Sequence, residues 1–157
     1  KTPQEMTEFN MEWLNLCREK LKDNGSIWIS GTYHNIFSIA NCLTELGYKI
    51  LNVVTWAKTN PPPNISCRYF TYSTEFIIWA RKKEKKPHYF NYDLMKYLNG
   101  NKQMTDVWRL SAIAPWEKNV ENTRLKNLLP CFLVSLWLRQ NRESGFLIPS
   151  AVVRQQV

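Results

Sequence analysis

The sequence predicts an α/β fold with an open sheet. Across residues 2–81, apolar segments with helical spacing alternate with short, apolar, β-branched runs, and glycines or prolines stand between several of them. The resulting order is helix, strand, helix, strand, loop and strand, which is typical of open α/β sheets. The 157 residues are enough for one domain with its own core.

The first helix and the first strand are expected at residues 2–24 and 26–31. The helix ends at the polar segment Lys22-Asp23-Asn24-Gly25. The strand Ser-Ile-Trp-Ile-Ser-Gly is short, and we expect it to be buried. The apolar side chains on or near one face of the helix are Phe9, Trp13, Leu14, Leu16, Cys17 and Leu21.

The second helix and the second strand are expected at residues 32–46 and 48–58. Gly47 ends the helix, because glycine tolerates the left-handed backbone of a C-terminal cap. Ligands of open α/β sheets lie at the carboxyl ends of strands, so residues 31–34 and 59–60 are expected at such ends. The apolar helix positions are Ile36, Phe37, Ile39, Ala40, Leu43 and Leu46.

The stretch 55–82 predicts a strand, a rigid loop and another strand. Prolines at positions 61–63 interrupt any ladder, since proline lacks an N–H. A stiff loop with amides, an arginine and aromatics could hold a nucleobase by its edge and stack on its face. From these residues alone, a buried hairpin with a polar turn is the favoured alternative. The polar and aromatic loop residues are Asn60, Asn64, Arg68, Tyr69 and Phe70.

Several side chains of this stretch have two interpretations. Lys58 contacts a phosphate or caps a strand, and Arg68 binds a phosphate or pairs with Glu75. Phe70 belongs to the core or stacks on a base. Glu75 accepts hydrogen bonds at the site or anchors the loop, and we favour the anchor.

The amino-acid composition changes after Arg81. Residues 82–121 are polar, tyrosine-rich and basic, with a short helix at Tyr92–Leu98 and an isolated strand at 106–110. We expect an insertion or ligand-facing subdomain here and not more sheet. The predicted segments are therefore a partial core at 1–81, the insertion at 82–121 and an atypical tail at 122–157.

Charge and composition favour an anionic partner. Lysine and arginine number 21 against 13 aspartates and glutamates, a net charge of +8, and nucleic acid is the commonest such partner. The four cysteines form no C-x-x-C pair and the two histidines lie far apart, so no metal site is predicted. No run can span a membrane and no signal peptide is visible, so we expect reduced thiols in the cytoplasm.

A joint pattern of segments carries a family resemblance. It comprises Asp23-Asn-Gly-Ser-Ile-Trp-Ile-Ser-Gly31, Trp56-Ala-Lys-Thr-Asn-Pro61, then Asn64, Arg68 and Phe70, then Thr74-Glu-Phe-Ile-Ile-Trp-Ala-Arg81, and Asp106-Val-Trp108. Over residues 6–118 the chain resembles the β group of restriction-modification DNA amino-methyltransferases, and most of all the adenine-N6 enzymes.

The resemblance implies an incomplete Rossmann-like methyltransferase sheet with a polar, basic insertion. Such enzymes bind S-adenosylmethionine and flip the target base of double-stranded DNA, whose amine attacks the methyl group directly. The implied bacterial, cytoplasmic enzyme belongs to a restriction-modification system with a cognate endonuclease; its oligomeric state is not implied. The implied residues are Gly31, Thr32 and Tyr33 near the cofactor; Asn60, Pro63, Asn64, Arg68 and Phe70 at the target base; and Lys58, Lys83, Lys85 and Lys86 at the DNA backbone.

Two departures from the family pattern predict a fragment. The catalytic Asp-Pro-Pro-Tyr tetrapeptide would precede the first helix, and Asn60-Pro-Pro-Pro63 lacks its aromatic residue. The cofactor segment Asp-Pro-Phe-x-Gly-x-Gly, expected near the C-terminus after His-Pro-Thr-Gln-Lys-Pro, is not present as written. We therefore expect no catalytic residue within this chain and no methyl transfer by it alone.

A frameshift near Glu121 is one explanation of the tail. In a frame displaced by two bases, codons for residues 122–128 can give His or Tyr followed by Pro-Thr-Gln-Lys-Pro. Codons for residues 147–156 can give Asp-Pro-Phe-Ser-Gly-Ser-Thr-Thr-Thr-Gly in that same frame. The alternative is a divergent native C-terminal segment, and the gene sequence decides between them.

The resemblance therefore predicts that this chain is part of a DNA adenine-N6 methyltransferase. A cytosine-N4 methyltransferase is the first alternative, because the same amine chemistry serves both bases. The second is a catalytically dead DNA-binding remnant, which would bind duplex in a salt-dependent way without cofactor. The third is a functionless product with an aggregation-prone tail.

Overall fold

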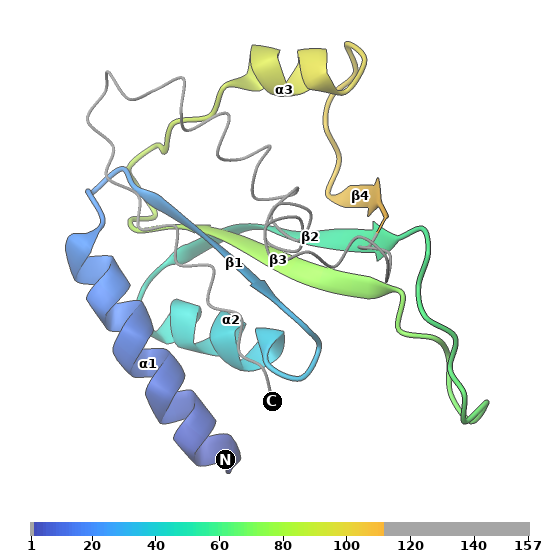
Figure 1. Cartoon of the computed structure of the whole chain (residues 1–157). Helices are drawn as coiled ribbons and strands as arrows, with labels where there is room; N and C mark the ends of the chain where they lie inside the picture. Colours follow the sequence, from blue (N-terminus) through green and yellow to red (C-terminus); the bar gives the residue numbers. More distant parts are fainter. Residues whose placement is uncertain (1, 112–157) are drawn as a thin grey trace, which may run out of the picture. The chain divides into compact units, whose positions relative to one another are not determined.

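The structure, a computed structural model, describes residues 2–111 as an α/β fold with a mixed sheet (Figure 1). The strand order is β1-β3-β2-β4; β1 runs antiparallel to β3, and β2 runs parallel to β4. The predicted α/β class is confirmed. The elements are α1 (Pro3–Lys20), β1 (Ser26–Gly31), α2 (Ile36–Glu45), β2 (Lys49–Lys58), β3 (Thr74–Arg81), α3 (Tyr92–Leu98) and β4 (Val107–Leu110).

The described residues fall into two compact units. The first holds residues 2–54 and 76–90, and the second holds residues 55–75 and 91–111. Helices α1 and α2 belong to the first unit, and the β2–β3 connection, α3 and β4 belong to the second. The segment boundaries predicted from the sequence stay a prediction, and the tail at 122–157 lies outside the described residues.

Local signals define the ends of α1. The Thr2 hydroxyl accepts a hydrogen bond from the Glu5 amide at 3.2 Å, and the Glu5 carboxylate accepts one from the Thr2 amide at 2.9 Å. After the helix, a Cβ at Gly25 would come within 2.9 Å of the Lys22 carbonyl oxygen. Only glycine fits this turn, which delivers the chain into β1.

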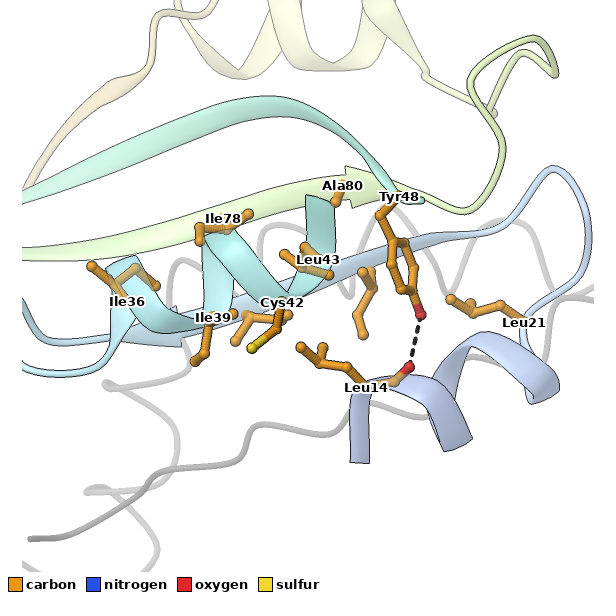
Figure 2. Packing of buried hydrophobic residues seen from close by; sticks show 11 residues of the cluster. Leu14, Leu21, Ile36, Ile39, Cys42, Leu43, Tyr48, Ile78 and Ala80 are labelled. Carbon is orange, nitrogen blue, oxygen red and sulfur yellow. Dashed lines mark hydrogen bonds between the residues drawn. The ribbon is translucent and has the colours of Figure 1, made fainter. Parts of the chain in front are cut away.

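The core of the first unit lies between the two helices and one face of β1 and β3 (Figure 2). Ile27 and Ile29 alternate along β1 toward the helices, as the two-residue period of a strand requires. On the other face of the strands, Trp28 stacks on Trp79 with ring centroids 4.7 Å apart. The buried cluster comprises Leu14, Leu21, Ile27, Ile29, Ile36, Ile39, Cys42, Leu43, Tyr48, Ile78 and Ala80.

Polar groups inside this core are paired. The Tyr48 hydroxyl donates to the Leu14 carbonyl at 3.1 Å, and this bond joins the residue before β2 to α1 (Figure 2). Asn10 is fully buried; its amide nitrogen donates to the Ser38 hydroxyl at 3.3 Å, and its oxygen accepts from the Trp13 indole at 3.1 Å. The bond to Ser38 links α1 to α2, and the pairing of both Asn10 polar atoms avoids the cost of an unpaired buried group.

The structure corrects three sequence predictions. The first helix ends at Lys20 and not at residue 24. The second helix begins at Ile36 and not at residue 32, because the Thr32 carbonyl accepts from the amides of Asn35 and Ile36 and closes a turn first. The strand expected to be isolated at residues 106–110 instead joins the sheet as β4, paired with β2 from Thr55↔Val107 to Lys58↔Leu110. The predicted bounds of β1 and α3 are confirmed.

Replacing Leu14 tests the core. We expect Leu14→Ala to lower the free energy of unfolding of the 157-residue chain by about 3 kcal/mol, since Leu14 is fully buried and its loss leaves a cavity. Urea unfolding followed by circular dichroism measures the change. The control is Leu16→Ala on the same helix, where the side chain is 53% exposed and a change within about 0.5 kcal/mol is expected. Equal losses in the two variants would contradict the packing.

Candidate functional site

The connection between β2 and β3, residues 59–73, is the candidate site. It is closed at its base, where the Lys58 amide donates to the Ser73 carbonyl at 2.8 Å. The Lys58 ammonium also lies 2.7 Å from the Glu75 carboxylate, and both side chains are largely buried. Glu75 therefore anchors the loop, as favoured from the sequence. A DNA contact by Lys58 stays a prediction.

Asn64 organises the distal turn of this loop. Its side-chain oxygen accepts from the Ser66 amide at 3.1 Å and from the Ser66 hydroxyl at 2.8 Å. Its side-chain nitrogen donates to the Tyr69 carbonyl at 2.6 Å, across the turn. Cys67 has a left-handed φ of 51° and donates its amide to the Asn64 carbonyl at 3.3 Å. One amide side chain thus holds both arms of the turn.

An open cavity of about 410 Å³ lies on this loop. Tyr69 and Tyr72 supply aromatic walls, with ring centroids 5.5 Å apart, and prolines supply a rigid apolar wall. The volume and lining suit a flat, partly polar ligand. The lining residues are Pro62, Pro63, Asn64, Ile65, Ser66, Tyr69 and Tyr72.

The predicted target-base residues divide into two groups. Pro63 and Asn64 line the cavity, whereas Asn60, Arg68 and Phe70 do not. Phe70 is 95% exposed, so it does not belong to the core. It does not line this cavity either. Arg68 is exposed, and the alternative of an Arg68 pair with Glu75 gives way to the Lys58 pair.

Two lining residues were missed or undervalued by sequence reasoning. The sequence predicts Tyr69 on the loop without a place in the pocket, and it gives Tyr72 no role, yet both line the cavity. The only signal in the sequence was their residue type, since both are tyrosines close to the prolines of the same loop. Their position beside the cavity depends on the fold of the loop and could not be predicted from the sequence.

The residues expected near a cofactor belong to the first unit. Gly31 ends β1 opposite Phe76, and a Cβ there would lie 3.3 Å from the Ile36 side chain. Thr32 and Tyr33 are exposed in the following turn, where the Tyr33 ring lies 3.8 Å from the ring of His34. The turn thus presents polar and aromatic groups at the carboxyl end of a strand.

The basic run after β3 is tied to Asp23. The ammonium groups of Lys83 and Lys86 lie 2.7 Å and 2.9 Å from the same Asp23 oxygen. Lys82 donates to the Leu21 carbonyl at 2.6 Å, so the run is folded onto the end of α1. Lys85 is exposed and has no carboxylate partner within residues 2–111. DNA contact by these lysines stays a prediction.

Comparison with known proteins places the chain in a family. A profile described as DNA methylase, for N6 and N4 methyltransferases, matches residues 1–143. The chain belongs to the DNA methylase family. The predicted resemblance to restriction-modification DNA methyltransferases is confirmed, whereas the Rossmann-like character of the sheet stays a prediction.

Individual relatives of this DNA methylase chain are bacterial. It is 66% identical over 110 residues to the Type II methyltransferase M2.MboI of Moraxella bovis, covering 70% of this chain and 40% of that protein. It is 59% identical over 116 residues to M2.DpnII of Streptococcus pneumoniae, covering 73% and 43%. A solved M1.HpyAVI–SAM complex is 34% identical with a TM-score of 0.43, covering 47% of this chain and 37% of its own. The chain spans about two-fifths of the length of the curated relatives it matches.

Two further observations concern the part of the chain that the structure describes. Between residues 2 and 111, no group of three or more histidine, cysteine, aspartate or glutamate side chains could hold a metal ion. No helix in this part of the chain is long and apolar enough to cross a bilayer.

The Asp23 cluster predicts a pH dependence of stability. Hydrogen bonds from Lys83 and then Lys86 lower the pKa of Asp23 from 3.8 to about 2. A carboxylate whose pKa is depressed in the folded state contributes stability above its unfolded pKa and loses it as pH falls through the folded value. We therefore expect wild type to be more stable than Asp23→Asn above pH 4, with the difference disappearing toward pH 2.

Urea unfolding at a series of pH values measures this difference. Glu12→Gln is the control, since Glu12 is exposed on α1 and has no basic partner among the described residues. A difference between wild type and Asp23→Asn that stays constant down to pH 2 would contradict the cluster.

Proposed function

We propose that this chain is part of an S-adenosylmethionine-dependent DNA methyltransferase that methylates the exocyclic N6 of a flipped adenine. The observation that carries the proposal is the cavity lined by Asn64, Tyr69 and Tyr72 on a stiff loop of a DNA methylase chain. A base that leaves the duplex needs an aromatic surface to replace its lost stacking, and tyrosine rings provide one. The net charge of +8 favours association with the phosphate backbone of double-stranded DNA.

The roles of the lining residues follow from their contacts. The polar atoms of the Asn64 side chain are engaged within the loop, so Asn64 positions the cavity walls and does not need to touch the base. Tyr69 and Tyr72 present ring faces to the base, and Pro62 and Pro63 supply a wall that does not change on binding. The preformed walls reduce the entropy lost when the base is held.

The cofactor site is only partly represented among the described residues. S-adenosylmethionine supplies the methyl group as a sulfonium. Residues 31–35 contain no acidic side chain for its ribose hydroxyls, and Tyr33 already packs on His34, so this turn does not fit the cofactor by itself. We propose that Gly31, Thr32 and Tyr33 form one wall of the site and that other parts of a full-length enzyme complete it.

The target base and the biological setting are also proposals. Cytosine N4 is the second candidate acceptor, because the matched family covers both N6 and N4 enzymes. The Type II designation of the relatives supports a cognate restriction endonuclease, and their bacterial sources support a bacterial cytoplasmic setting.

A chimera tests the proposed function. The 110 matching residues of M2.MboI are replaced by those of this chain, and the purified protein is incubated with unmethylated genomic DNA and cofactor labelled at the methyl group. We expect label in the DNA, recovered after digestion as N6-methyladenine; N4-methylcytosine would favour the alternative. We expect no transfer by the 157-residue chain, which contains neither an Asp-Pro-Pro-Tyr nor a Gly-x-Gly segment.

M2.MboI itself is the positive control for this assay. A folded chimera that leaves DNA unlabelled would contradict the proposed function. Transfer by the isolated chain would contradict its description as a fragment.

Tyrosine substitutions test the cavity. We expect Tyr69→Ala in the chimera to lower kcat/KM about tenfold, since a base–aromatic stack contributes roughly 1–3 kcal/mol. Tyr97→Ala is the matched control, because Tyr97 lies on α3, is 72% exposed and does not line the cavity. Initial rates of methyl transfer measure both variants, and equal rates would exclude Tyr69 from the base pocket.

A further inference from the structure

Two apolar side chains at the tip of the 59–73 loop are held in solvent. Ile65 and Phe70 are each 95% exposed, more than any other large hydrophobic residue among residues 2–111. Ile65 stands at the rim of the cavity, and Phe70 lies outside it. The remaining large apolar side chains of this tip, Tyr69 and Tyr72, are only about half exposed.

The turn that presents these side chains is organised and not slack. The Asn64 side-chain amide donates across it to the Tyr69 carbonyl at 2.6 Å, so Ile65 lies inside the closed turn, directly after Asn64, and Phe70 directly follows its other end. The Ser66 bonds to Asn64 and the left-handed Cys67 fix the chain between them. The two side chains therefore project from a preorganised turn.

A cation stands between the two apolar residues in the sequence. Arg68 is exposed. The Glu75 carboxylate at the base of the loop forms its ion pair with Lys58, at 2.7 Å. The tip therefore combines two apolar side chains, an arginine and an aromatic cavity. The apolar side chains suit the base stack, the arginine suits a phosphate, and the aromatic cavity suits an extruded base.

We propose that Ile65 and Phe70 form a wedge that enters the base stack of DNA as the target base leaves it, with Arg68 on the adjacent phosphate. This rests on the proposed function and deepens it: Phe70 acts as a positioning residue for the flipped state and not as part of the base pocket. An extruded base leaves a gap between its neighbours, and apolar side chains such as isoleucine and phenylalanine fill such gaps. The cavity that Ile65 borders then receives the base.

The test uses the M2.MboI chimera and a duplex containing its mapped methylation site. With 2-aminopurine at the target position, fluorescence rises when the base leaves the stack. We expect Ile65→Ala and Phe70→Ala each to reduce this rise and to lower the methylation rate on unmodified duplex about tenfold. Phe37→Ala, a 65% exposed phenylalanine on α2, is the matched control and is expected to leave both unchanged.

A second duplex separates a wedge from a structural role. When the nucleotide opposite the target base is abasic, the target is already unpaired and flipping costs less. We expect the methylation rate of Phe70→Ala to recover on this duplex to within about twofold of the unsubstituted chimera, with an unchanged melting temperature.

Three results would overturn the wedge. Phe70→Ala could methylate both duplexes as fast as Phe37→Ala, or its defect could persist on the abasic duplex. A lowered melting temperature of Phe70→Ala would instead assign the side chain to packing within the full-length protein. Failure of the proposed function is distinct, because the unsubstituted chimera would then label no DNA at all.

Discussion

The prolines at positions 61–63 impose the constraint on which the candidate site depends. Proline donates no backbone hydrogen bond, so a strand cannot continue through these positions; β2 ends at Lys58 and β3 begins at Thr74. Within this connection, the Asn64 side chain pairs with the Ser66 amide and hydroxyl and with the Tyr69 carbonyl. The cavity walls and the exposed apolar tip both follow from this arrangement.

In the first unit, two helices cover one face of two paired strands. Regular alternation in β1 and β3 directs one set of side chains toward α1 and α2, and the tryptophans of the other set stack on each other. The segment after β3 is then held by two kinds of bond. The Lys82 amide donates to the Gly25 carbonyl, and Asp23 binds the lysine ammonium groups. A run of like charges is thereby kept folded although its members repel one another.

Local signals in the sequence predicted most of the fold. Apolar periodicity located α1, β1 and α3, because these depend on neighbours within a few residues. The late start of α2 was missed, since the turn at Thr32 competes with a helix that the periodicity also allows. The pairing of β4 was missed because a four-residue strand carries little pattern, and its partner Thr55 lies about fifty residues away.

The candidate site was predictable in outline only. The proline-rich loop, Pro63 and Asn64 could be chosen from residue type and from the family pattern. Burial of the Lys58–Glu75 pair, the lysines on Asp23 and the outward position of Phe70 depend on three-dimensional contacts that residue type does not encode. Phe70 shows this best, because an aromatic residue beside a pocket is as easily a neighbour of the pocket as a part of it.

The hydrogen bonds that shape the tip of the loop are all local in sequence. Each joins residues no more than five positions apart, from Asn64 to Tyr69 at the widest. Such short closures lose little chain entropy and do not require the helices to form first. The shape of the tip is thus encoded within residues 64–69, so we expect this segment to keep its shape when it is transferred to a related enzyme.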